Sequence, residues 1–355
     1  MAVSFPSIRR TNDYYRQRYP ELFEKIEEQS LARFLSPSNS VPRNVFEEEM
    51  QPYLSDPFRG TINRWVLSPD ESSLTLEYQA ACDVLAASQI TIDEIDLMLV
   101  ASVWPEQIIL GNATFLANRL GLKGAAWNIN GGTGSTPIAL QTASALVQSG
   151  QYNQVLVVVS CTYAHFFDEA DTMSWFTSDA AGAFLVSSLE PSQGVLGTKV
   201  IHTGIMDVVS ARPVNNSHGN PQVHIQISND ANKLANTLAE EFLKTCCKGA
   251  CEVAGVRLDQ IDFFIFHTLS AWFANFAARV LDINPEQTIN LYPHYGNCGP
   301  VLTVANLYYA AQLEKIKEND LVLIYGMGGA GVAAANVMRW GKVALGTNPL
   351  ADIKI

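Results

Sequence analysis

Two stretches of the chain share one order of polar and apolar positions. Residues 91–102 read "TIDEIDLMLVAS" and residues 257–268 read "RLDQIDFFIFHT", so each places an apolar-Asp-x-Ile-Asp segment before an apolar run. A short apolar run bounded by polar residues is typical of a strand that is buried in a parallel sheet. The pattern therefore predicts two equivalent buried strands.

A second agreement relates residues 130–157 to residues 297–324 without a gap. The offset, 297 minus 130, is 167 residues. From Thr136 to Leu146 the matched positions advance by four, three and three residues, which is one face of a helix. Each half of the chain is thus predicted to contain a strand, a glycine-rich turn, a buried helix and another strand.

The repeat predicts an α/β fold of two similar halves, with helices on both sides of mostly parallel sheets. Turn-forming residues without periodicity at 187–195 mark the junction, so we expect one domain over 1–189 and a second over 190–355. The first domain carries an N-terminal extension. Within it, residues 11–33 have the pattern of one amphipathic helix that packs on the body of the protein or on a partner.

The composition narrows the function classes. Of 355 residues, 48% are hydrophobic and 16% are charged, which indicates a globular protein with surface buried against another subunit. A net charge of −12 argues against nucleic-acid binding, which needs clustered Lys and Arg. The apolar runs are too short to cross a bilayer, and none follows the N-terminal arginines, so we expect neither a membrane span nor a secretory signal.

Six cysteines are scattered along the chain: Cys82, Cys161, Cys246, Cys247, Cys251 and Cys298. No pair has the spacing of a zinc site, and the histidines have no spaced partner, so we expect no metal. Three of the cysteines fall close together in a predicted helix, where apolar packing is their expected role. Without a disulfide pattern, the expected location is the reducing cytoplasm.

Residues 128–140, "NINGGTGSTPIAL", have the form of an active-site turn: a strand end, tight glycines, one small residue and a helix start. Such a turn presents backbone N–H groups at the positive end of a helix, where an oxyanion is stabilised. The small residue is Thr133, and an alcohol needs a neighbouring base to act as a nucleophile. Three roles stay open for Thr133: it is acylated, it lines the site, or it caps the helix, which we favour.

The chain resembles the thiolase superfamily, and within it the ketoacyl-acyl-carrier-protein synthase III branch, over roughly residues 33–340. The segment around "NINGGTGSTPIAL" is similar to the nucleophile turn of the family, and "TSDAAGAFLVSS" to the glycine motif that closes the first half. "IDFFIFH", "YGNCG" and "GMGGAGV" are similar to the site motifs of the second half. The resemblance implies a thiolase-like fold of duplicated α/β halves, layered α-β-α-β-α.

The resemblance also implies a Cys-His-Asn triad. By position, His267 is the histidine, Asn297 is the asparagine, and Thr133 stands where the family has its cysteine. The N–H groups of Gly328 and Thr133 would form the oxyanion hole. In the family, the histidine and asparagine also stabilise the enolate that forms when a malonyl thioester loses carbon dioxide. If Thr133 is acylated, His267 would have to serve as its base.

The acyl pocket is expected around the loop "SVWPEQIILGN" (102–112), which in the family reaches across a dimer interface. By this resemblance Trp104, Glu106 and Ile109 would line the pocket, together with Cys298 beside the asparagine. Glu106 does not match the position of the glutamate base of some relatives cleanly, so a solvated loop residue is its simpler interpretation.

The loop that covers the entrance in the family is basic there, but here it reads "HFFDEADTMSWF" (165–176) and is acidic and aromatic. Arg59, Arg64 and Trp65 would partly replace the missing basic group, or they are ordinary residues of a loop. The expected substrate is acyl-coenzyme A or an acyl chain on the phosphopantetheine arm of a carrier protein. No permanently bound cofactor is expected.

Two functions follow from the sequence. The first is an acyltransferase of the ketosynthase III type, which moves an acyl group from a thioester to an acceptor in a fatty-acid, polyketide-like or specialised metabolite pathway. The second is a non-catalytic, ketosynthase-like partner subunit that lacks the cysteine nucleophile. We expect a homodimer in the first case and a ketosynthase-like heterodimer in the second.

Overall fold

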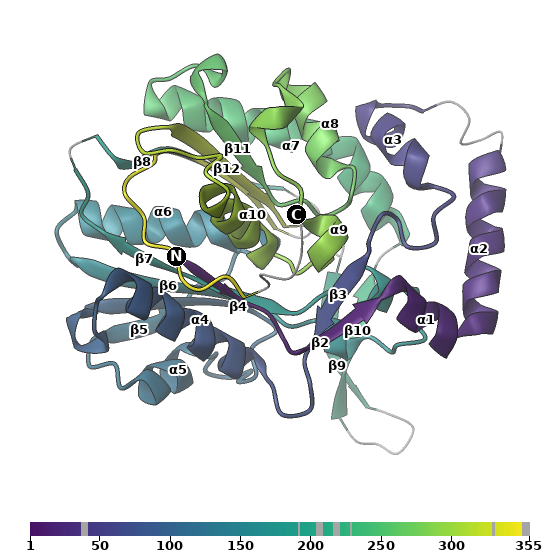
Figure 1. Cartoon of the computed structure of the whole chain (residues 1–355), viewed down its shortest axis with the longest axis horizontal. Coiled ribbons are helices and arrows are strands. Elements are labelled where there is room, and N and C mark those ends of the chain that lie inside the picture. The colour runs from purple at the N-terminus through teal and green to yellow at the C-terminus, as the bar shows by residue number, and fades with distance from the viewer. Residues whose placement is uncertain are drawn as a thin grey trace.

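The computed structural model describes residues 1–36, 42–190, 192–203, 209–215, 221–227, 229–328 and 331–349. For residues 165, 209–215, 221–227 and 229–237 it describes the main chain alone. Two large sheets and the helices around them make up most of the molecule (Figure 1).

The first sheet contains β1 (Ala2–Ser4), β4 (Leu97–Val103), β5 (Ala125–Asn128), β6 (Gln154–Cys161) and β7 (Ala180–Ser187). Their order across the sheet is β1-β7-β6-β4-β5. β4 pairs in parallel with β5 and β6, whereas β7 pairs antiparallel with β6 and β1. The central strands β4 and β6 are buried along nearly their whole length, as the apolar run predicted for β4.

The second sheet contains β8 (Gly194–His202), β11 (Phe263–Phe266), β12 (Leu321–Met327) and β13 (Val332–Arg339). Their order is β11-β12-β13-β8, with β11 and β12 parallel. The predicted domain boundary after residue 189 falls between β7 of the first sheet and β8 of the second. Two ribbons complete the strands: β2 (Ile8–Thr11) with β3 (Asn63–Val66), and β9 (Val209–Asn215) with β10 (Pro221–Ile227).

Helices separate and cover the two sheets. α6 (Ser135–Gln148) and α10 (Val301–Gln312) lie between them, and the side chains of α10 are buried from Val301 to Ala310. α4 (Ser73–Ser88) and α5 (Ala113–Leu120) cover the outer face of the first sheet, and α7 (Asn229–Ala254) and α8 (Phe273–Leu281) cover the second (Figure 1). The layer order is α-β-α-β-α, so the predicted fold class is confirmed. The short helices are α3 (Val45–Met50) and α9 (Tyr292–Tyr295).

The sequence repeat has a direct structural counterpart. The N–H of Asp96 donates to the Gln154 carbonyl at 3.0 Å, and its carboxylate accepts the N–H of Gln154 at 3.1 Å. The N–H of Asp262 donates to the Leu321 carbonyl at 2.9 Å, and its carboxylate accepts the N–H of Leu321 at 2.8 Å. In each half the parallel strands then pair from the next residue onwards. The repeated aspartate therefore sets the same strand register twice.

The N-terminal segment differs from the predicted single helix over 11–33. It forms α1 (Asn12–Arg18) and α2 (Pro20–Leu35), separated at Tyr19. Proline has no N–H to continue the first helix but fits the first position of a new one, which is where Pro20 lies. The three clustered cysteines lie buried in α7, so their predicted packing role is confirmed.

Candidate active site

The glycine turn joins β5 to α6 through a short 3-10 helix, η4 (Gly132–Gly134). Gly132 has a φ of 58°, in the left-handed region that glycine adopts without strain. The hydroxyl of Thr133 donates a hydrogen bond of 2.6 Å to the backbone carbonyl of Met327, at the end of β12. The N-cap of α6 is Gly134, without a side-chain cap, so the prediction that Thr133 caps the helix is wrong.

Ser135, the other hydroxyl of the turn, stabilises the turn itself. It is buried, donates to the Gly132 carbonyl at 2.6 Å and accepts the N–H of Gly131 at 3.0 Å. Its proton and one lone pair are therefore both in use, in agreement with a structural role.

His267 directly follows β11, and its N–H donates to the Tyr325 carbonyl at 2.9 Å. The side chain is only 2% exposed, and its Nε2 lies 3.4 Å from Oδ1 of Asn297. Burial lowers the pKa of His267 to about 4, although Asn297 and the Met327 main chain favour the charged form. The imidazole is therefore neutral at pH 7 and is a weak base but a ready N–H donor.

Asn297 is held from two sides. Its Oδ1 accepts the N–H of Gly299 at 3.0 Å, which fixes the orientation of the side-chain amide. Its own N–H donates to the Phe176 carbonyl at 2.7 Å, and its carbonyl accepts the N–H of Ser178 at 2.9 Å. Because the amide oxygen faces His267, the favoured tautomer of that imidazole carries its hydrogen on Nε2.

Gly328 does not fit the predicted oxyanion hole. Its N–H donates to the Val332 carbonyl at 2.8 Å and is therefore occupied. A Cβ at Gly328 would lie 3.3 Å from the Thr133 nitrogen, so the two turns are in close approach. Among the residues that the structure describes, the N–H of Thr133 has no hydrogen-bond partner. Its role as an oxyanion donor stays a prediction.

The structure thus brings the three predicted side chains together at the end of β12. Thr133 bonds to the Met327 carbonyl, the same main chain favours the charged form of His267, and His267 faces Asn297. One of these residues comes from the first half of the chain and two from the second. The site therefore lies where the two halves meet.

The predicted pocket residues have mixed environments. Trp104 has a φ of 67°, and its ring lies 5.2 Å from that of Phe166, measured between ring centroids. Glu106 is exposed, in agreement with a solvated loop residue. Ile109 is 95% exposed, so it does not line a pocket within its own chain. Cys298 is fully buried, and burial raises the pKa of its thiol, so the thiolate is not favoured.

The basic residues proposed for the entrance are structural. Arg64 is fully buried and donates to the Trp175 carbonyl, and Trp65 is buried and donates to the His294 carbonyl at 3.1 Å. The partly buried Arg59 donates to the Tyr53 carbonyl at 3.1 Å. The expectation that Arg64 and Trp65 partly replace the basic group of the entrance is therefore wrong, because both side chains are buried.

A cavity of about 540 Å³ lies away from this site. Its walls include Ser144 and Gln148 from the second half of α6, and Met338 and Trp340 at the end of β13. Thr133 precedes the opposite end of the same helix, so this cavity does not belong to the triad.

Two family descriptions match the halves of the chain. 3-Oxoacyl-[acyl-carrier-protein (ACP)] synthase III matches residues 128–204, which hold the glycine turn. 3-Oxoacyl-[acyl-carrier-protein (ACP)] synthase III C terminal matches residues 251–340, which hold His267 and Asn297. Both matches support a chain that is similar to the ketoacyl-acyl-carrier-protein synthase III branch of the thiolase superfamily.

Three known proteins are similar to the chain over most of their length. The chain is 28% identical over 323 residues to the β-ketoacyl-[acyl-carrier-protein] synthase III of Porphyra purpurea, covering 86% of this chain and 96% of that protein. The 3-oxoacyl-[acyl-carrier-protein] synthase III of Aquifex aeolicus superposes with a TM-score of 0.75 at 22% identity, covering 95% and 97% of the two chains. OleA of Xanthomonas campestris, in a cysteine-to-serine form with lauric acid and lauroyl-CoA, superposes with a TM-score of 0.73 at 15% identity. The match covers 96% of this chain and 99% of that chain.

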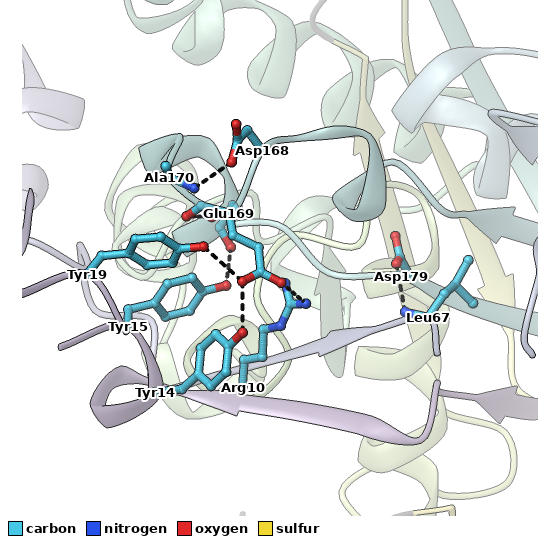
Figure 2. A network of polar contacts seen from close by, with 10 residues as sticks. Arg10, Tyr14, Tyr15, Tyr19, Leu67, Asp168, Glu169, Ala170 and Asp179 are labelled. Atoms are coloured by element: carbon cyan, nitrogen blue, oxygen red, sulfur yellow. Dashed lines mark hydrogen bonds and ion pairs between the residues drawn. The ribbon is translucent and has the colours of Figure 1, made fainter. Parts of the chain in front are cut away.

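One contributor to this site was not predicted. The Met327 carbonyl has no sequence signal, because any residue supplies a backbone oxygen. Asp179, two residues after the bridge of Thr177 to Asn297, was also not predicted. It is buried and accepts the N–H of Leu67 at 3.1 Å (Figure 2) and the N–H of Ala164 at 2.8 Å. Burial raises the pKa of Asp179 to about 7. Its signal was present, as one acidic residue within the small and apolar run "TSDAAGAF".

In the described part of the chain, no helix combines the length and apolarity that crossing a bilayer requires. Over the same residues, the His, Cys, Asp and Glu side chains form no group of three that would hold a metal ion.

Proposed function

We propose that this chain is an acyl-transferring condensing enzyme of the ketoacyl synthase III type. The observation that carries the proposal is the convergence of the Thr133 turn, His267 and Asn297 on one point at the end of β12. The available N–H of Thr133 would receive the oxygen of the thioester carbonyl as it becomes an oxyanion. Acyl-coenzyme A or an acyl carrier protein would supply the acyl group, as expected from the sequence.

We further propose that Thr133 is not acylated. Its hydroxyl donates a hydrogen bond to the Met327 carbonyl, and a carbonyl oxygen does not serve as a base. His267 faces Asn297, and its pKa of about 4 makes it a weak base for an alcohol. These facts favour direct transfer, in which the acceptor forms a bond to the acyl carbon while the C–S bond breaks. Any proton that the acceptor loses ends on the released thiol.

The neutral His267 and Asn297 fit an acceptor that needs hydrogen-bond donors more than a base. A β-carboxy thioester, such as a malonyl thioester, obtains its nucleophilic electron pair by releasing carbon dioxide. Its thioester oxygen then carries the enolate charge, which the amide N–H groups of Asn297 would stabilise, together with the imidazole N–H once it turns from the Asn297 amide oxygen to the substrate. This acceptor would form a carbon–carbon bond to the acyl carbon, and the thiolate released from the donor would take its proton from water.

The second candidate function is a non-catalytic partner of an active ketosynthase-like subunit. The threonine in place of the cysteine supports it, since the Thr133 hydroxyl donates to the Met327 carbonyl. Retention of the His267–Asn297 pair favours the catalytic proposal, because the fold alone has no need for a buried imidazole beside an amide.

Intact mass and turnover distinguish these functions. The chain, Thr133→Ala and Thr133→Cys would each be incubated with acyl-coenzyme A and acyl-carrier-protein donors and a malonyl thioester. We expect no adduct on the native chain, turnover that survives in Thr133→Ala, and an acyl adduct on Thr133→Cys. Thr142→Ala is the matched control, because this hydroxyl bonds within α6 to the Ile138 carbonyl. An adduct on the native chain that Thr133→Ala abolishes would refute direct transfer, and turnover only with a second subunit would support the partner function.

A further inference from the structure

The N-terminal strap, which we define as residues 8–35, holds the acidic loop through one carboxylate. Glu169 accepts hydrogen bonds from the hydroxyls of Tyr14 at 2.8 Å and Tyr19 at 3.1 Å, and it also pairs with Arg10. Figure 2 shows these three side chains of the strap pointing at the carboxylate. Their convergence gives one of the acidic residues of the loop, Glu169, its partners within the molecule.

Aromatic packing makes a second connection between the strap and the loop. Tyr15 of the strap and Trp175 of the loop are both fully buried, with ring centroids 5.8 Å apart. The hydroxyl of Tyr15 donates to the Ser174 carbonyl at 2.8 Å. Fully buried aromatic pairs of this size contribute strongly to local stability. The end of the loop is therefore fixed by the strap as well as by its own turns.

A buried guanidinium makes the third connection. Arg64 of β3 donates to the Trp175 carbonyl on the loop and to the Asn12 side chain at the start of α1. Its guanidinium lies 4.9 Å from the ring centroid of Phe58, and burial lowers its pKa to about 10. A charge buried in this way is costly unless its partners stay in place, so it penalises separation of the strap from the loop.

The loop that the strap fixes continues directly into residues 176–178, which bond to the main chain of Asn297. The carbonyl of Phe176, one residue after Trp175, accepts the main-chain N–H of Asn297. The N–H of Ser178, three residues after Trp175, donates to the carbonyl of Asn297. Thr177 forms the bridge between these two segments. A shift of the loop would therefore displace the main chain of Asn297, and with it the 3.4 Å contact between its amide oxygen and His267.

We propose that the N-terminal strap is a positioning element for Asn297, and that Glu169 is its main positioning residue. The carboxylate accepts hydrogen bonds from three donors of the strap, which hold the loop in place. The loop in turn holds the main chain of Asn297. Neither the strap nor Glu169 contacts the proposed reacting atoms, so the effect is on geometry. Its consequence for turnover rests on the proposed function, whereas its consequence for the Asn297 main chain does not.

Amide hydrogen exchange and steady-state kinetics of Glu169→Ala test this proposal. We expect the N–H of Asn297 to exchange at least tenfold faster than in the native chain, and kcat to fall about tenfold with KM nearly unchanged. Asp259→Ala is the control, because it removes a carboxylate that pairs with Arg257 on the surface of the other half. The combined Tyr14→Phe and Tyr19→Phe variant keeps both rings, and we expect an intermediate acceleration.

Unchanged exchange at Asn297 in folded Glu169→Ala, or in the double Tyr→Phe variant if Glu169→Ala does not fold, would overturn the proposal. Faster exchange in a chain without turnover would retain the positioning role and reject the proposed function. Faster exchange at Asn297 together with native kcat would also overturn the proposal, since the position of the amide would then not matter.

Discussion

The protonation state of His267 decides what the site does at the scale of single residues. Burial is the dominant influence and lowers its pKa to about 4, because an imidazolium without water or a carboxylate beside it is unstable. Asn297 is a neutral neighbour and offsets only part of this effect. The site therefore presents the same donors across the physiological pH range.

A pH profile checks this protonation state. If neutral His267 is the active form, kcat/KM will stay flat on the acid side down to about pH 5 and fall near pH 4. Asn297→Asp would place a negative charge beside the imidazole and raise its pKa by one unit or more, moving the acid limb upwards. NMR titration of the imidazole gives the same value without turnover. An acid limb near 6.5 in the native chain would contradict the assigned environment.

The sequence predicted these residues unequally. His267 and Asn297 were found because each belongs to a recognisable motif, "IDFFIFH" and "YGNCG", and Thr133 because it lies between glycines. Gly328 and Arg64 were misjudged, since a sequence does not reveal which N–H is already bonded or which arginine is buried. Such properties depend on long-range contacts, and the contact between Thr133 and Met327 spans the two halves.

At the scale of elements, one buried carboxylate joins α4 to the first sheet. Glu77 of α4 is fully buried and accepts the hydroxyls of Ser102 on β4 and Ser160 on β6, the latter at 2.6 Å. The side-chain amide of Asn112, which precedes α5, donates to both carboxylate oxygens at 3.0 Å. Burial raises the pKa of Glu77 to about 7 despite these donors. Four elements thus depend on one ionisable group.

The free energy of unfolding should depend on pH through the titration of Glu77. Its pKa is about 7 in the folded chain and about 4.5 in the unfolded chain, so the folded chain binds more protons between these values. The stabilisation that protonated Glu77 gives to the folded chain is fully present below pH 4.5 and is lost as the pH rises through 7. We expect Glu77→Gln to remove this part of the pH dependence of the unfolding free energy, about 1–3 kcal/mol between pH 5 and pH 8.

Denaturant unfolding at several pH values measures this difference. Glu252→Gln is the control, because it removes an exposed carboxylate of α7, away from the first sheet. Comparison with the native chain cancels the contributions of Asp179, which has the same sign, and of His267, which has the opposite sign. If the free energy of unfolding changed equally with pH in the native chain and in Glu77→Gln, Glu77 would titrate as an ordinary carboxylate.

Elements were predicted better than their packing partners. The repeat gave the strands and the two buried helices, because apolar periodicity is a local property of the sequence. The division of 11–33 at Pro20 had its signal in the sequence, but the amphipathic pattern continued across it. The attachment of this segment to Glu169 had no such signal, since its three donors are about 150 residues or more away.

At the scale of the whole molecule, apolar side chains remain exposed beside the free edge of the first sheet. β5 is the edge strand, and Trp127 on it is 39% exposed. The nearby loop exposes Ile108, Ile109 and Leu110, and α5 exposes Phe115. An uncovered strand edge with apolar neighbours is a surface that proteins normally cover. A second copy of the chain, paired along β5, is the partner that we propose for it.

Substitution of Ile109 tests this association. Ile109→Asp adds a charge to the most exposed apolar side chain of the surface, on a chain whose net charge is already −12. We expect sedimentation to give a dimer for the native chain and a monomer for the variant at micromolar concentration, with the fold unchanged by circular dichroism. Val253→Asp, at another exposed apolar position, should leave the dimer intact. A native monomer, or a dimer that survives Ile109→Asp, would reject pairing along β5, and turnover lost together with the dimer would indicate that this loop completes the partner's pocket.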